Sequence, residues 1–153
     1  KKEEGPPRVG VVAFIKDLRK PLAITAKIDE EIMCHWIERK NQIAMVELFA
    51  PVLALAMMGK FLEKKKVLLF VDSEPVEGAL VKGYSSRSDM CELTGEFWHL
   101  AHRWDIRIYI DRVPTDSNPS DGLSRNKLAE VFAYGWELVR DPVLSGLFSE
   151  RKI

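Results

Sequence analysis

The stretch VLLFVDS, residues 67–73, decides the fold of this chain. Its first five residues are all apolar, which predicts a strand covered on both faces in the interior of an α/β sheet. Asp72 follows at the carboxyl end of this strand, and ligands collect outside those ends in open α/β sheets. Residues 73–82 then predict a short helix that ends at Gly83.

A helical period precedes this strand. From Gln42 onward, one helical stripe holds apolar residues and a single carboxylate. Pro51 would kink this helix or break its first half. The longest strongly apolar stretch without charge, residues 48–59, is shorter than the ~20 residues that span a bilayer, so no membrane partner is expected. The stripe consists of Ile43, Glu47, Ala50, Ala54, Met57 and Phe61.

The amino-terminal part predicts a β-hairpin. Residues 9–15 and 22–28 are β-branched and apolar runs, and the turn residues 17–21 lie between them. Residues 1–8 are charged and then rich in glycine and proline, which is typical of a tail or loop. Residues 29–41 predict an irregular or short helical connection.

The carboxyl-terminal half predicts two more helices and a strand. Asp89 and Glu92 resemble a capping pair at the start of a helix, and residues 106–111 alternate as in a half-exposed strand. Residues 113–122 predict a loop. We expect a last helix capped by Ser124, with inward-facing Leu128, Val131, Phe132 and Leu138.

This element order predicts an α/β domain with a mixed sheet, in which residues 9–140 form the domain and residues 141–153 a carboxyl-terminal extension. The 153 residues, of which 46% are hydrophobic and 30% charged, fit one soluble globular domain. The 23 basic residues balance 23 acidic ones, which gives no basic excess of the kind that nucleic-acid binders usually carry. A nuclease with an acidic site remains compatible with this balance. The two widely spaced thiols, Cys34 and Cys91, favour a reducing intracellular compartment, either cytoplasm or nucleus.

Three carboxylates occupy positions at which the hydrophobic pattern points toward the sheet: Glu47, Asp72 and Asp121. Each has an ordinary explanation: Glu47 can pair with a lysine, Asp72 can end a strand, and Asp121 can cap a helix. Taken together, they are explained more simply as a cation site. Ligation by carboxylates alone favours Mg²⁺ or Mn²⁺. Many enzymes that hydrolyse phosphodiesters use two such ions.

Three segments resemble ribonuclease H domains. QIAMVELFA (residues 42–50) resembles the first helix of the family, and residues 67–83 resemble the next catalytic strand and helix. NPSDGLSR (residues 118–125) resembles the "Asn-Pro-Ala-Asp…Ser-Arg" ending of ribonuclease H domains in retroelement reverse transcriptases. The resemblance spans roughly residues 9–140. It implies a ribonuclease H-like mixed sheet flanked by helices, and Mg²⁺-dependent hydrolysis of the RNA strand of an RNA–DNA hybrid.

The resemblance also implies roles for single residues. Glu47, Asp72 and Asp121 would be catalytic residues that ligate Mg²⁺ or Mn²⁺, with two ions in a complete site. Residues that would contact the hybrid are Ser73, Lys82, Ser85, Ser86 and Arg87, although exposed serines and basic residues are more often simply solvated.

The departure from the family concerns its first strand, which carries an aspartate that bridges both ions. No residue of this chain supplies that aspartate, because Asp17 falls in the hairpin turn. The first strand is therefore expected to be missing from this chain. A second hypothesis follows, in which the domain is catalytically inactive and serves as a structural or interaction module beside other domains of a polyprotein or larger assembly. A third is another nuclease or an integrase of the same fold.

Overall fold

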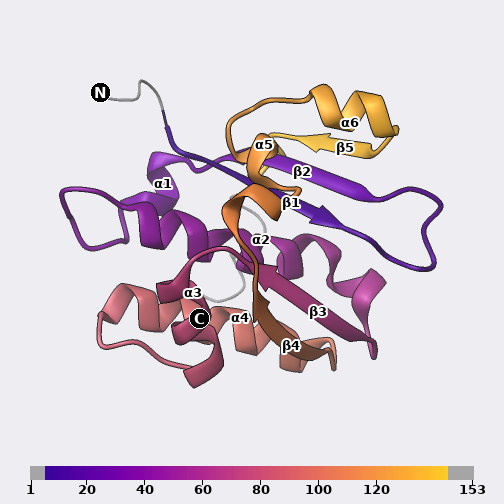
Figure 1. Ribbon diagram of the computed structural model, residues 1–153. Coiled ribbons are helices and arrows are strands. Elements are labelled where there is room, and N and C mark those ends of the chain that lie inside the picture. Colours follow the sequence, from indigo (N-terminus) through magenta and orange to yellow (C-terminus); the bar gives the residue numbers. More distant parts are fainter. Residues whose placement is uncertain (1–5, 145–153) are drawn as a thin grey trace.

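The computed structural model describes residues 6–144, and residues 1–5 and 145–153 lie outside the described part. Two small sheets and several helices make up this part (Figure 1). In chain order the elements are β1 (Arg8–Ala13), β2 (Leu22–Lys27), α1 (Glu30–Met33), α2 (Ile43–Leu62), β3 (Lys66–Val71), α3 (Glu74–Lys82), α4 (Ser88–Arg103), β4 (Arg107–Arg112), η1 (Thr115–Ser117), α5 (Asp121–Ser124), α6 (Ala129–Tyr134) and β5 (Glu137–Arg140).

The strands form two separate sheets, ordered β1-β2-β5 and β3-β4. β1 and β2 pair antiparallel with Arg8 opposite Lys27, which confirms the predicted hairpin. β5 lies parallel to β2, and β3 lies parallel to β4. β1 and β3 are thus the edges at which the two sheets face each other, and they run in opposite directions (Figure 1).

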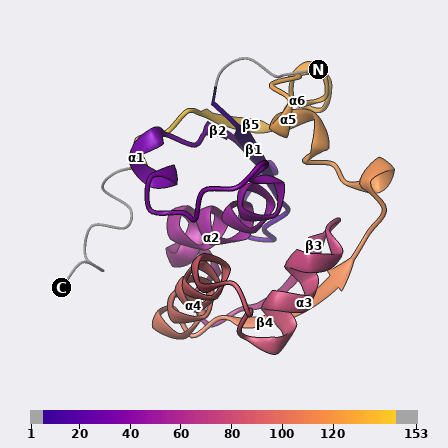
Figure 2. The same cartoon turned by 90° about the vertical axis from the view of Figure 1, so that its left-hand side faces the viewer.

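Helix α2 packs against both β1 and β3, and α4 packs against α2 (Figure 2). The predicted apolar stripe of α2 is not its buried face, since Ile43 is 61% and Phe61 39% exposed. The helix is apolar around most of its circumference, so its periodicity does not select one face. Pro51 lies inside the helix and is buried, and the predicted break does not occur. The buried residues are Met45, Leu48, Phe49, Pro51, Val52, Leu53, Ala54, Leu55, Met58, Gly59 and Leu62, of which only Ala54 belongs to the predicted stripe.

The 20 residues of α2 exceed the apolar stretch counted from the sequence. By length and composition alone this helix can cross a membrane, with a mean hydropathy of 1.7. However, 56% of its apolar window is buried inside the protein, as in the core helix of a soluble domain. The absence of a membrane partner stays a prediction.

Strand β3 is covered on one face only. Val67 and Leu69 pack against the main core, whereas Leu68 is 69% and Phe70 51% exposed. The prediction of cover on both faces is therefore wrong, because among residues 6–144 no element buries the outer face. The alternation predicted for β4 is confirmed, with Ile108 and Ile110 packed against the core.

The predicted ends of α3 are confirmed, and the predicted cap of α4 is wrong. Ser73 caps α3 by accepting a hydrogen bond from the Val76 amide at 3.4 Å, and Gly83 ends the helix with a left-handed backbone at φ 82°. Helix α4 already begins at Ser88. Asp89 therefore lies inside its first turn, where the carboxylate is occupied by Arg39.

The single last helix predicted from the sequence is also wrong. Ser124 ends α5 instead of capping a helix, and its hydroxyl donates to the Asp121 carbonyl at 2.7 Å. Positive φ angles at Asn126 (59°) and Gly135 (68°) interrupt the helical path. Phe132 is 73% exposed. The other three residues expected to face inward, Leu128, Val131 and Leu138, pack in a small second core with Ala23 and Leu123.

The predicted domain limits, residues 9–140 with a tail before and an extension after, stay a prediction. The Asp141 carboxylate accepts hydrogen bonds from the Arg8 side chain at 3.0 Å and from the Lys27 amide at 3.1 Å. Leu144 is buried in the main core. The chain therefore continues to pack on the domain for at least four residues after Arg140.

Candidate active site

A groove of about 2070 Å³ separates β1 from β3. Its two walls are these edge strands, and α2 contributes residues along its length. The segment that joins β4 to α5, and α5 itself, contribute further lining residues, and in Figure 1 this segment runs from the end of β4 up to α5. The groove therefore runs between the facing edge strands of the two sheets.

Two of the three predicted carboxylates meet in this groove. Glu47 comes from the second turn of α2, and Asp72 comes directly after β3, at the carboxyl end of that strand. Burial raises the pKa of Glu47, and the negative charge of Asp72 adds to the increase. The Ser73 hydroxyl donates a hydrogen bond to the Glu47 carboxylate, which opposes that increase. Glu47, Asp72 and Ser73 thus form one cluster, called here the acidic cluster, in which burial raises the pKa of Glu47.

Pro51 affects the same turn of α2. A proline has no amide hydrogen, so the carbonyl of Glu47, four residues earlier, receives no helical hydrogen bond from it. Pro51 therefore leaves the Glu47 carbonyl without its usual intrahelical donor.

Asp121, the third predicted carboxylate, also lines the groove but is held apart from the other two. It opens α5, and its carboxylate lies 3.6 Å from the Arg125 guanidinium, with 34% of the Asp121 side chain exposed. Asn118 fixes the approach to α5, because its side-chain oxygen accepts hydrogen bonds from the amide and the hydroxyl of Ser120 at 2.9 and 2.7 Å. Asp121 thus faces the groove from the opposite rim.

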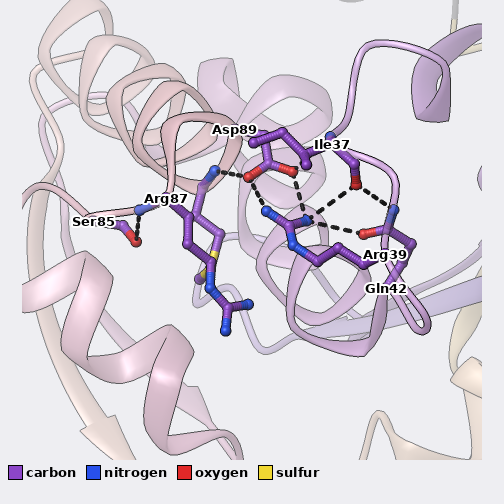
Figure 3. Close-up of polar contacts among 7 residues, drawn as sticks. Ile37, Arg39, Gln42, Ser85, Arg87 and Asp89 are labelled. Carbon is purple, nitrogen blue, oxygen red and sulfur yellow. Dashed lines mark hydrogen bonds and ion pairs between the residues drawn. The ribbon is translucent and has the colours of Figure 1, made fainter.

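Of the residues expected to bind substrate, Ser73 lines the groove and the other four do not. Ser73 belongs to the acidic cluster, but Lys82 ends α3, and Ser85, Ser86 and Arg87 form the loop before α4. Ser85 accepts a hydrogen bond from the Arg87 amide at 3.2 Å, and the Arg87 guanidinium points away from Asp89 (Figure 3). Their role in binding a hybrid stays a prediction.

A second polar cluster lies near this loop and has a structural role. Asp89 receives two hydrogen bonds from Arg39, at 2.7 and 2.5 Å, and a third from the Ile37 amide at 3.0 Å (Figure 3). The Arg39 guanidinium holds the pKa of Asp89 below its usual range. Gln42 also contacts Arg39, so the cluster fastens the connection before α2 to the start of α4.

The acidic cluster does not amount to a metal site by itself. Among residues 6–144, no group of three or more acidic, histidine or cysteine side chains is arranged to hold an ion. Mg²⁺ takes six oxygen ligands and usually keeps several waters, so Glu47 and Asp72 would fill only part of its coordination shell, while Asp121 faces Arg125 instead. The carboxylates of residues 6–144 therefore do not form a complete two-ion site.

The sequence analysis missed two ion pairs at the groove. The first joins Asp121 and Arg125, and their i,i+4 spacing is a signal in the sequence that could have predicted it. The other is the ion pair between Asp17, after β1, and Lys65, before β3, whose charged atoms lie 2.8 Å apart across the opposite end of the groove. No sequence signal predicts this pair, because it depends on how the two edge strands face each other.

Comparisons with known proteins support the architecture. No protein-family model and no curated protein matches the sequence. Among solved structures, the crystal structure of RNase H1 from the halophilic archaeon Halobacterium salinarum is similar, with a TM-score of 0.57 and 22% sequence identity over 84% of this chain and 92% of that chain. The chain therefore has a ribonuclease H-like fold, a mixed α/β architecture in which helices flank the sheets, and the predicted fold class is confirmed.

Proposed function

We propose that this chain acts on RNA–DNA hybrids and hydrolyses the RNA strand, as the ribonuclease H domain of a retroelement-type reverse transcriptase. The observation that carries the proposal is the pairing of Glu47 with Asp72 at the carboxyl end of β3, inside a groove open to a large ligand. This edge is where α/β sheets place their ligands. The fold and the three family-like segments support the same reading.

The residues of the acidic cluster can accept or hold a proton next to a bound phosphate. Asp72 is half-buried and can accept a proton from an attacking water. Glu47, whose pKa is raised by burial, can hold a proton at a higher pH than an exposed glutamate does. The Ser73 hydroxyl acts in the opposite direction and lowers the pKa of Glu47.

Dependence on Mg²⁺ or Mn²⁺ is part of the proposal and requires ligands beyond these residues. The family resemblance assigns one such ligand to the first strand, which this chain does not contain. The proposal therefore expects weak cleavage by residues 1–153 alone, and stronger cleavage by a longer protein that contains that strand. An intracellular, reducing location is proposed from the thiols of Cys34 and Cys91, which are both free.

The test is a cleavage assay with end-labelled RNA in a hybrid, in a single strand and in an RNA duplex, with Mg²⁺ or Mn²⁺ added. We expect cleavage of the hybrid RNA only, and a loss of about 10²-fold or more for Asp72→Asn. Asp116→Asn, an exposed acid outside the cluster, is the matched control and should keep full activity. Unchanged cleavage by Asp72→Asn would refute the assignment of Asp72.

A second candidate is an inactive interaction module in a larger assembly. It is favoured by the separation of Asp121, which faces Arg125, from Glu47 and Asp72. Fluorescence anisotropy with a labelled hybrid separates the two functions, since the enzyme must bind the hybrid before it cleaves. A protein that neither binds nor cleaves the hybrid, including in its longer form, would favour the module.

A further inference from the structure

The charges of this chain are unevenly distributed, although they sum to zero. Three connections lie together where β3 and β4 begin: the hairpin turn (residues 14–21), the turn between α2 and β3, and the turn between α4 and β4 (right-hand side of Figure 1). Lys66 lies opposite Arg107 in the register of the two strands, and the Lys65 ammonium lies 2.8 Å from the Asp17 carboxylate in the hairpin turn. We call this part of the molecule the basic end. Its basic side chains are Lys16, Arg19, Lys20, Lys60, Lys64, Lys65, Lys66, Arg103 and Arg107.

The basic end carries a formal charge of +5. Its nine basic residues, of which eight are exposed, are accompanied by the four carboxylates of Asp17, Glu63, Asp105 and Glu137. The rest of the chain therefore carries −5, and the acidic cluster lies at the other end of β3, about 20 Å away for a strand of six residues. The positive charge that nucleic-acid binders usually carry is thus concentrated at one end of this chain, where it attracts polyanions.

Three aromatic rings border the basic end. Phe14, in the hairpin turn, and Tyr134, at the end of α6, are each 67% exposed. Trp136 contacts both of them: its ring meets Phe14 edge-on at 6.2 Å and stacks on Tyr134 at 5.5 Å, measured between ring centroids. The Glu137 amide donates a hydrogen bond to the Pro21 carbonyl at 2.9 Å, which holds these rings beside the hairpin turn. We call the three rings the aromatic platform.

The aromatic platform does more than close the core. Trp136 packs partly against the small second core, but among residues 6–144 neither Phe14 nor Tyr134 belongs to a hydrophobic core. Their rings therefore keep most of their surface in contact with water. Contiguous apolar surface of this kind, next to polar residues, is typical of an interaction site.

We propose that the basic end and the aromatic platform together bind single-stranded nucleic acid. Exposed cations beside exposed rings are typical of sites that follow a phosphate backbone and stack its bases. An unpaired strand fits better than a duplex, because the bases of a duplex stack on one another and offer no free face to the rings. An apolar protein partner would not need the cations, and an anionic lipid surface would not need stacked rings. The binding requires neither the acidic cluster nor cleavage, so it stands apart from the nuclease activity proposed above.

The first test measures how binding depends on salt. The full 153-residue protein is titrated into a labelled thymidine strand of ~12 nucleotides, within the length that such sites cover, and fluorescence anisotropy is recorded in EDTA. We expect saturable binding that weakens as salt rises, because the lysines release counterions from the phosphates. A matched uridine strand should bind equally, since phosphate contacts and stacking do not need the 2′-hydroxyl. Absence of saturation at low salt would overturn the proposal.

Charge variants locate the phosphate contacts. The double variant Lys64→Gln/Lys66→Gln should make the slope of log K against log salt shallower by about 1.4, since each phosphate contact to a single strand contributes ~0.7. The matched control is Lys27→Gln/Arg140→Gln, which changes two exposed cations at the opposite ends of β2 and β5. The control should leave the slope unchanged, and an equal change of slope in both double variants would contradict a site at the basic end.

Ring variants separate stacking from general attraction of polyanions. Phe14→Ala/Tyr134→Ala should weaken binding at least fivefold at every salt concentration and leave the slope unchanged, because base stacking releases no counterion. Tyr134→Phe keeps the ring and should bind like the parent protein, as should Phe132→Ala, an exposed ring on another side of α6. Unchanged binding by the double ring variant, or equal affinity for a duplex of the same length, would overturn the proposal. Melting temperatures close to that of the parent protein show that each variant is folded.

Discussion

Asp89→Asn is the sharpest test of how the helices are held together. The carboxylate is 4% exposed and accepts two hydrogen bonds from Arg39, which is itself 19% exposed. Breaking a buried ion pair by removing one partner costs about 3–5 kcal/mol, because a charge is left without compensation. The partial exposure of Arg39 reduces this to roughly 2–4 kcal/mol in the free energy of unfolding. For a domain of this size that is a fall in melting temperature of roughly 5–15 °C.

The pH dependence separates the ion pair from general damage. The pKa of Asp89 is lowered from 3.8 by its hydrogen bonds with Arg39, so its stabilisation is fully present above pH 3.8 and is lost as the pH falls through the lowered value. Circular dichroism melts between pH 2.5 and 7 should therefore show the variant approaching the parent protein in acid. The double variant with Arg39→Met and Asp89→Leu should lose less than Arg39→Met alone. A loss in Asp89→Asn below about 0.5 kcal/mol, or one that is constant with pH, would refute the reasoning.

Three other substitutions test the site and the packing around it. Glu47→Gln should raise the melting temperature at pH 7, because burial raises the pKa of Glu47 and the ionised form is disfavoured; the gain should vanish below pH 4.5, where the carboxyl is protonated in both states. Gly10→Val should lower the free energy of unfolding, measured with denaturant, by about 1–3 kcal/mol, because a Cβ at this position would lie 2.5 Å from the Leu123 side chain. Gly78→Ala has open space around its Cβ and should raise the free energy of unfolding by about 0.5–1 kcal/mol. Thr25→Val should lose about 1–2 kcal/mol, because the buried Thr25 hydroxyl donates to the Leu123 carbonyl at 2.7 Å; an unchanged midpoint would show that this bond contributes nothing.

Local signals predicted the elements whose ends are marked by the sequence itself. The hairpin, α3 with its end at Gly83, and the alternating β4 all depend on neighbouring residues, and each was predicted correctly. Glu47 and Asp72 drew attention because a carboxylate on an apolar helix and another at the end of an apolar strand are both unusual; both line the groove, and their catalytic role stays a prediction.

The wrong predictions concern features that depend on distant parts of the chain. The buried face of α2 is chosen by α4 and the sheets, since the helix itself is apolar on most sides. Leu68 and Phe70 form part of an apolar run, yet they are exposed because no described element covers them. Asp89 has the sequence appearance of a helix cap, but Arg39, fifty residues away, determines its role.

The division of the strands into two sheets affects how the protein unfolds. Among residues 6–144, no strand ladder links β1-β2-β5 to β3-β4, so the two halves are joined by side-chain packing around α2 and by the connecting segments. Strands that share backbone hydrogen bonds tend to unfold together, whereas two parts joined by side-chain packing can unfold separately. We therefore expect local unfolding of one sheet, while the other stays folded, to cost less free energy than unfolding of the whole domain. Because α2 packs against both sheets, its packing sets that cost.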